Sequence, residues 1–122
     1  MVTQQFLILG VSMASKYRYL LTKRAESDLD GIISYIAVEL GNPKAASEFV
    51  DKLQGYIEDV ITFPESGSPV DNEFLQVENV RKKLIGNYIM YYLPGSREKT
   101  IFILRIVYSK CDMDAIFKKL DI

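Results

Sequence analysis

The chain has 122 residues, of which 48% are hydrophobic and 25% are charged, and its formal net charge is −1. This length and composition are those of one globular domain with a single core. Histidine is absent and cysteine occurs once, so the sequence excludes internal disulfides, histidine-based catalysis and the usual zinc sites.

The first 15 residues carry no charged side chain, and their only apolar run, residues 6–11, is too short to span a bilayer. No Lys or Arg precedes that run, which argues against a signal peptide. Met13 opens a stretch that reads as a natural start. We therefore expect residues 1–15 to be an extension from an upstream start codon, or else an extra strand or partner-binding arm. Residues 16–122 are expected to form the single domain.

The first half of this domain predicts a strand and two helices. Residues 17–22 alternate well enough for a strand, and Thr22 suits the N-cap of the helix that follows. Asn42 is placed as the N-cap of a second helix with Pro43 at its first position. Both helices show apolar residues at helical spacing, namely Ala25, Leu29, Ile32, Ile33, Ile36 and Leu40, then Ala46, Phe49, Val50, Leu53, Ile57 and Val60. The short connection between the helices predicts an antiparallel helical hairpin.

The second half predicts three strands after a loop at residues 65–79. The strands are expected at residues 80–86, 87–93 and 100–108, where β-branched and aromatic residues are dense. The pairs Gly86-Asn87 and Pro94-Gly95 are expected to make the two hairpin turns.

A final short helix completes the predicted fold. Asp112 can cap it, and its apolar residues are Met113, Ile116, Phe117 and Leu120. The predicted class is α+β in the order β-αα-βββ-α, with an antiparallel sheet packed on the helical hairpin. We expect the helices to cover one face of the sheet and to leave the other face free for a ligand or partner.

Charge is divided unevenly between the helices and the sheet. Residues 79–110 contain seven Lys and Arg against one acid, whereas residues 24–78 contain twelve acids against three bases. A basic sheet beside acidic helices indicates an anionic partner on the sheet, although edge lysines can also serve solubility alone. We predict that Arg81, Lys83 and Arg105 form a positive patch. Arg105 lies in an apolar run, and its pairing with an acid such as Asp112 is an equally open reading.

Several segments together resemble the RelE/ParE toxin superfamily, over residues 17–120. They are residues 21–29 (LTKRAESDL), Tyr35, residues 42–46 (NPKAA) with Phe49, residues 63–67 (FPESG), the Arg81 strand, residues 88–91 (YIMY), and residues 103–106 (ILRI) leading to Asp112. The resemblance implies the toxic half of a bacterial type II toxin–antitoxin pair, cytoplasmic and neutralised by an antitoxin encoded alongside. We expect no cofactor, and no metal site because histidine is absent and cysteine occurs once. The helical-hairpin sequences are more similar to the ParE branch.

The branch decides the chemistry that the resemblance implies. Ribosome-dependent mRNA endonucleases of the RelE kind use basic residues on the sheet to neutralise a scissile phosphate, and a base near the C-terminus to activate the 2′-hydroxyl. Arg81, Lys82 and Lys83 match the basic second strand of that branch, and Lys110 falls where it places a basic residue after the last strand.

Other positions depart from the nuclease pattern. Tyr88 stands where the nucleases carry a catalytic arginine, and Phe117 lies near the position of their tyrosine. Tyr108 occupies the place of a histidine in many relatives, and it would act as a base only if its pKa were lowered strongly from about 10. The set Arg81, Lys83, Arg105, Tyr108 and Lys110 is therefore expected to be catalytic in a nuclease and target-binding otherwise.

The resemblance also implies a surface for the antitoxin. Tyr88, Met90 and Tyr92 lie on one side of their strand by the period-two rule, which predicts an apolar partner-binding strip. We expect the antitoxin segment to be acidic and amphipathic, and disordered until it docks.

Three functional hypotheses remain at this point. The first is a toxin that inhibits growth by binding an essential target, with DNA gyrase the target that the family implies. The second is a ribosome-dependent mRNA endonuclease. The third is an inactive relic that only binds its antitoxin.

Overall fold

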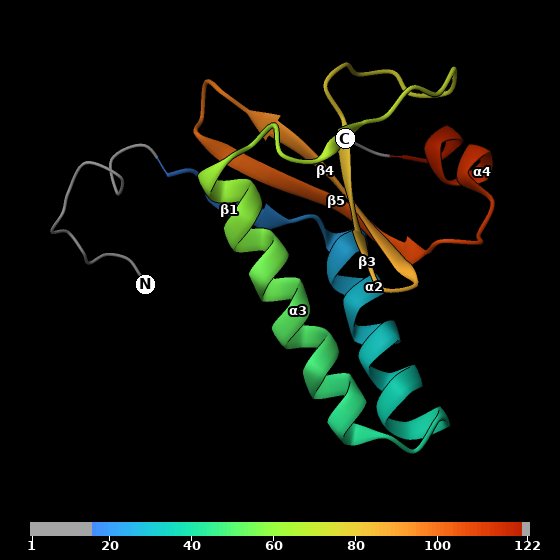
Figure 1. Ribbon diagram of the computed structural model, residues 1–122. Helices are drawn as coiled ribbons and strands as arrows, with labels where there is room; N and C mark the ends of the chain where they lie inside the picture. The colour runs from blue at the N-terminus through green and yellow to red at the C-terminus, as the bar shows by residue number, and fades with distance from the viewer. Residues whose placement is uncertain (1–15, 121–122) are drawn as a thin grey trace, which may run out of the picture.

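A five-stranded sheet and a long helical hairpin make up most of the computed structural model (Figure 1), which describes residues 16–120. The elements are, in chain order, β1 (Arg18–Leu21), α2 (Lys23–Ser34), the π-helix η1 (Tyr35–Glu39), α3 (Pro43–Thr62), β2 (Ser68–Pro69), β3 (Arg81–Ile85), β4 (Tyr88–Gly95), β5 (Thr100–Tyr108) and α4 (Met113–Lys118). The α+β class and the predicted order are confirmed, with the two-residue strand β2 added inside the expected loop. The expected extension, residues 1–15, lies outside the described residues.

The helical hairpin begins and turns where the capping residues predict. The side chain of Thr22 accepts a hydrogen bond from the backbone N–H of Ala25 at 3.1 Å, and that of Asn42 accepts one from Ala45 at 3.1 Å. Gly41 ends the first helix with a positive φ of 62°, a conformation that favours glycine.

One feature of the first helix differs from the prediction. After Ser34 it continues as the π-helix η1, closed by a bond from the N–H of Leu40 to the carbonyl of Tyr35. Because a π turn holds more residues than an α turn, it rotates the residues that follow away from the buried face. Leu40 was expected on the apolar face, and that expectation is wrong because its side chain is 58% exposed.

The sheet has the strand order β1-β5-β4-β3-β2. β1 pairs parallel to β5, and the other neighbours pair antiparallel, so the predicted antiparallel sheet carries one parallel edge strand. Gly86, with a φ of 60°, makes the β3–β4 turn as predicted. Pro94 and Gly95 instead belong to the end of β4, and the turn to β5 follows them.

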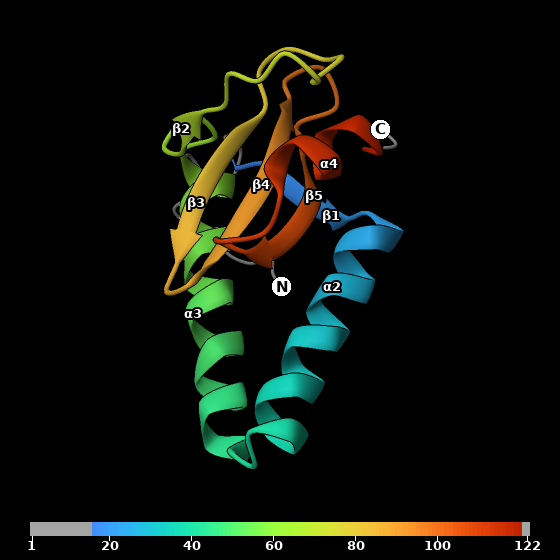
Figure 2. The ribbon, with the colours of Figure 1, turned by 90° about the vertical axis from the view of Figure 1, so that its right-hand side faces the viewer.

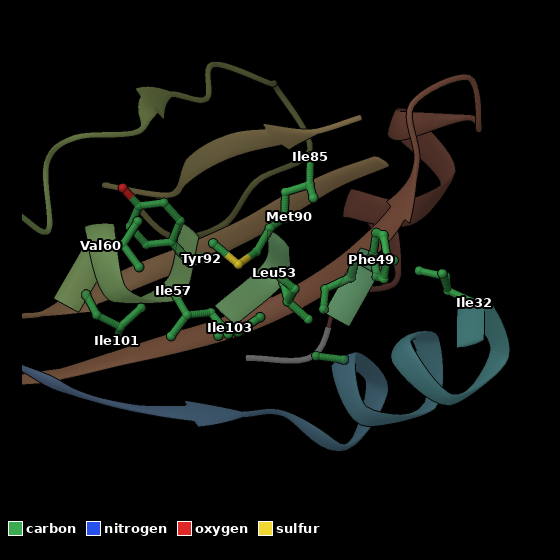
Figure 3. Close-up of a cluster of buried hydrophobic side chains, with 12 residues drawn as sticks. Ile32, Phe49, Leu53, Ile57, Val60, Ile85, Met90, Tyr92, Ile101 and Ile103 are labelled. Atoms are coloured by element: carbon green, nitrogen blue, oxygen red, sulfur yellow. The ribbon is translucent and has the colours of Figure 1, made fainter. Parts of the chain in front are cut away.

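Helices α2 and α3 pack on one face of the sheet and form the main core (Figure 3). Its buried residues come from both helices and from β3, β4 and β5, and they include Ile32, Phe49, Leu53, Ile57, Val60, Ile85, Met90, Tyr92, Ile101, Ile103 and Ile106. Alternate residues of the strands point away from this core, which gives the sheet a second apolar face.

The second face is not free, so the prediction of an open sheet face is wrong. Phe117 of α4 packs there on Tyr91 with ring centroids 5.1 Å apart, and Val80, Ile89, Leu104 and Val107 join the same cluster. Phe74, Leu75 and Val77 from the loop before β3 pack against it. Figure 2 shows α4 lying against β4 and β5. The apolar side chains of α4 and of the loop before β3 are buried against this face of the sheet, which removes them from water.

The closed end of the helical hairpin extends past the end of the sheet. Figures 1 and 2, seen from directions 90° apart, both show α2 and α3 continuing beyond the β3–β4 turn. On this projecting end the side chains of Tyr35, Val38 and Leu40 are exposed to solvent, whereas Ile36 packs against the main core.

Candidate functional site

Arg81 holds a loop of the fold in place. Its Nη1 donates hydrogen bonds to the backbone carbonyls of Gly67 at 2.7 Å and Glu65 at 3.0 Å. The hydroxyl of Tyr92 accepts from the N–H of Gly67 at 2.9 Å and donates to the carbonyl of Pro64 at 2.8 Å. Together these bonds fix residues 64–67 against β3 and β4. The guanidinium of Arg81 is thus engaged within the protein.

Gly67 is required by the closeness of this contact. A Cβ atom at Gly67 would lie 2.6 Å from the carbonyl oxygen of Lys82 and 2.6 Å from the hydroxyl of Tyr92. Any side chain would push the loop away from the two groups that bind it.

Lys83 lies on the side of the sheet that α3 covers. Its Nζ is 5.8 Å from the centre of the Tyr56 ring, a cation–π contact at the margin of the helical hairpin. Arg81 and Lys83 pair with Tyr92 and Met90 across β3 and β4, so all four side chains belong to one face.

Arg105 is paired with an acid of the first helix. Its Nε and Nη2 donate to the two carboxylate oxygens of Asp28 at 2.8 Å and 3.0 Å, and the side chains are only 14% and 15% exposed. The hydrogen bond with Asp28 raises the pKa of Arg105. The acid considered from the sequence, Asp112, is instead the N-cap of α4.

The predicted patch of Arg81, Lys83 and Arg105 is therefore not assembled. Strand β4 lies between β3 and β5, and the two arginines bind separate internal partners. The reason is that Arg105 is drawn to the carboxylate of Asp28, which the sequence places 77 positions away.

The predicted partner strip is also corrected. Met90 and Tyr92 do share a face with Tyr88, but that face is the one under α2 and α3, and both side chains are fully buried. The period-two rule groups side chains on a face without telling which face is covered. Of the three, Tyr88 alone reaches a surface hollow.

A surface hollow of about 770 Å³ opens between α2 and the end of β5. Three tyrosines line it together with the Asp28–Arg105 pair, and these are Tyr35, Tyr88 and Tyr108. Tyr88 packs edge-on against Tyr108 at 5.9 Å and against Phe49 at 5.2 Å between ring centroids. Burial, and then the nearby Tyr35 and Tyr108, raise the pKa of Tyr88 above its ordinary value.

The structure brings three of the predicted site residues to this hollow, namely Arg105 and Tyr108 of β5 and Tyr88 of β4. Lys110 is exposed beyond the end of β5. Sequence reasoning missed Asp28 and Tyr35 as site residues. An arginine inside an apolar strand signals a carboxylate partner, but nothing in the sequence selects Asp28 from the other acids. Tyr35 was noted only as part of the family resemblance.

Three further properties of the described residues complete this description. Among residues 16–120, no group of three or more His, Cys, Asp and Glu side chains is placed to hold a metal ion. Burial raises the pKa of the Cys111 thiol, which lowers its reactivity as a nucleophile. Within the described part of the chain, no helix has both the length and the apolar character needed to cross a membrane.

Sequence comparison relates residues 19–113 to a family model described as the ParE toxin of the type II toxin–antitoxin system parDE. The chain is 33% identical to Toxin ParE1 of Caulobacter vibrioides over 86 residues, which cover 70% of this chain and 85% of that protein.

Comparison with solved structures extends the similarity in fold. A chain of the chromosomal ParDE system of P. aeruginosa matches with a TM-score of 0.61 and 22% identity, over 79% of this chain and 99% of that one. A chain of the RelBE2 toxin–antitoxin complex of Mycobacterium tuberculosis matches with a TM-score of 0.54 and 21% identity, over 76% and 98% of the two chains. A mutant of E. coli toxin RelE in the free state matches with a TM-score of 0.56 and 13% identity, over 82% of this chain and 90% of that one.

Proposed function

This chain belongs to the ParE toxin family of type II toxin–antitoxin systems, and from that membership we propose that it arrests growth by binding an essential target protein. DNA gyrase is the proposed target, as the family implies. A cognate antitoxin is the proposed partner that neutralises it.

The observation that carries this proposal is that both arginines of the expected site are engaged inside the protein. Arg105 forms a two-bond pair with Asp28, and Arg81 donates to the carbonyls of Glu65 and Gly67. A phosphoryl-transfer site needs cations that face the developing charge on phosphorus. Arg105 is neutralised by Asp28, and the Nη1 group of Arg81 is held by two backbone carbonyls. Both arginines would have to give up these bonds to face a phosphate fully, which favours target binding over RNA cleavage.

The antitoxin is proposed to occupy the hollow lined by Tyr35, Tyr88 and Tyr108. Two of the solved structures with this fold are of toxin–antitoxin systems, RelBE2 and ParDE. An aromatic-lined hollow of about 770 Å³ can hold the apolar side chains of a bound segment. This location replaces the strip of Met90 and Tyr92, which are buried.

One observation favours the second candidate, a ribosome-dependent mRNA endonuclease. Arg105 and Tyr108 line the same hollow, and Lys110 follows them on the chain. In such an enzyme Tyr108 would have to accept a proton from the 2′-hydroxyl, and Arg105 would have to leave Asp28 to reach the phosphate.

Induction of the chain without its antitoxin separates the two candidates. The proposal expects a DNA damage response and accumulation of gyrase-linked DNA breaks, with intact mRNA. Cleaved mRNA within minutes of induction, with no DNA damage response, would overturn it in favour of the endonuclease. Co-expression of the antitoxin should restore growth in either case.

A further inference from the structure

The projecting end of the helical hairpin exposes three large apolar side chains. Tyr35, Val38 and Leu40 are 50%, 71% and 58% exposed, and all three fall within or next to the π-helix η1. We call these three residues the hairpin tip. The three residues fall within six consecutive positions, and a cluster of exposed apolar side chains is typical of an interaction surface.

The π-helix is what turns the tip outward. Apolar side chains at helical spacing from Ile32 would have placed Leu40 on the buried face. The bond from the N–H of Leu40 to the carbonyl of Tyr35 widens the turn and exposes Leu40 instead. π-Helical turns are rare, and they occur frequently at functional sites.

Charge around the tip limits the kind of partner. Residues 30–51 contain four acids and one lysine, and all five side chains are exposed: Asp30, Glu39, Glu48, Asp51 and Lys44. This negative surface repels nucleic-acid phosphates and anionic lipid. It also disfavours pairing with a second copy, whose tip carries the same charge. The complementary partner is a protein with an apolar recess and a basic rim.

We propose that the hairpin tip is the surface that contacts the toxin's target, by inserting Tyr35, Val38 and Leu40 into an apolar recess rimmed by Lys and Arg. This inference rests on the proposed function, since it assumes that toxicity comes from binding a target protein. Tyr35 also lines the hollow proposed for the antitoxin. An antitoxin seated in the hollow would thus reach one residue of the tip, which gives neutralisation a direct steric cause.

The test compares two variants that remove exposed apolar side chains from different places. The double variant Val38→Ser, Leu40→Ser alters the tip. Leu84→Ser on β3 is the matched control, because Leu84 is 60% exposed and lies outside the hairpin. Each protein is induced to equal level without antitoxin, and surviving colonies are counted. Thermal unfolding of each purified protein confirms that it is folded.

The tip variant should raise the number of surviving colonies about tenfold or more, because two apolar side chains that anchor the target are removed. Leu84→Ser should remain as toxic as the wild type. A charge-reversing variant, Glu39→Lys with Glu48→Lys, should also weaken toxicity, since it removes attraction to a basic rim.

A folded tip variant with full toxicity would overturn the inference, and so would equal loss of toxicity in Leu84→Ser. Failure of the proposed function would be seen in a different experiment, the induction of the wild-type toxin without antitoxin. There it would appear as mRNA cleavage without a DNA damage response. Because the tip is scored by growth arrest alone, its test gives an answer whichever target the wild type is found to act on.

Discussion

Asp28 on α2 and Arg105 on β5 form a two-bond ion pair at 2.8 Å and 3.0 Å, and Asp28 also accepts the backbone N–H of Ile106 at 2.9 Å. β1 pairs with β5 only from Thr100 to Ile103, so the carboxylate of Asp28 takes the place of a neighbouring strand beyond that point. The pair therefore ties the first helix to the edge of the sheet.

Replacing Asp28 with Asn should destabilise the fold. The change leaves the guanidinium of Arg105 largely buried without its counter-charge, and we expect a loss of about 1–3 kcal/mol in the free energy of unfolding. Urea denaturation measures it. Glu48→Gln is the control, because Glu48 is an exposed acid of α3 and its replacement should change stability little. Equal stability of the Asp28→Asn variant and the wild type would show that the pair contributes nothing.

Removing the side chain of Arg81 should lower the stability of the fold more than removing that of Lys83. Arg81→Ala deletes two charge-assisted hydrogen bonds to the loop at residues 64–67 and should cost about 1–3 kcal/mol of stability. Lys83→Ala removes a marginal cation–π contact and should cost less than about 1 kcal/mol. The comparison is made by denaturant unfolding of the two single variants. If Arg81→Ala were as stable as Lys83→Ala, the structural role of Arg81 would be refuted.

Two glycines give opposite predictions for the same substitution. Gly67→Ala places a Cβ 2.6 Å from the carbonyl oxygen of Lys82 and should destabilise by about 1–3 kcal/mol. Gly55→Ala, inside α3 with nothing near its Cβ, should stabilise by up to about 1 kcal/mol. Melting temperatures of both variants decide this. A Gly67→Ala protein with the same melting temperature as the wild type would show that the loop at residues 64–67 can shift at little cost in stability.

Much of the fold could be predicted because it depends on local signals. Thr22, Asn42 and Asp112 cap their helices as expected, and Gly86 makes its turn. The positions of these residues follow from hydrogen bonding and backbone preference over three or four residues. The π-helix was missed because it breaks a regular apolar spacing that the sequence otherwise continues to Leu40.

The site could be predicted less well because it depends on contacts between distant segments. Periodicity correctly grouped Tyr88, Met90 and Tyr92 but could not tell that the hairpin covers their face. The partner of Arg105 lies 77 residues away, and no rule of spacing selects Asp28 from the other acids. The free sheet face was expected from a simple two-layer arrangement, whereas α4 and the loop before β3 form a third layer.

Stability should fall in strongly alkaline solution. Burial raises the pKa of Tyr91 to about 12 in the folded chain, while an unfolded tyrosine has a pKa of about 10. Above pH 10 the unfolded chain loses a proton that the folded chain keeps, so stability present below about pH 10 is lost as the pH rises toward 12. Unfolding by urea at several pH values from about 9 to about 11.5 measures how steeply the free energy of unfolding falls with pH.

Tyr91→Phe isolates the contribution of that hydroxyl. The variant should lose less stability than the wild type over the same pH range, although burial also raises the pKa of Tyr88 and Tyr92 and some decline should remain. Its stability at neutral pH will also change because the hydroxyl of Tyr91 donates to the sulfur of Met113. An identical slope in the variant and the wild type would show that Tyr91 does not control it.

This ParE-family toxin is proposed to act by binding its target and not by cleaving RNA. The decisive measurement adds the purified toxin to purified DNA gyrase in a supercoiling assay, with ribosomes translating a defined mRNA as the parallel reaction. We expect gyrase to be inhibited, prior addition of the antitoxin to prevent this inhibition, and the mRNA to stay intact. Cleaved mRNA together with unaffected gyrase would contradict it.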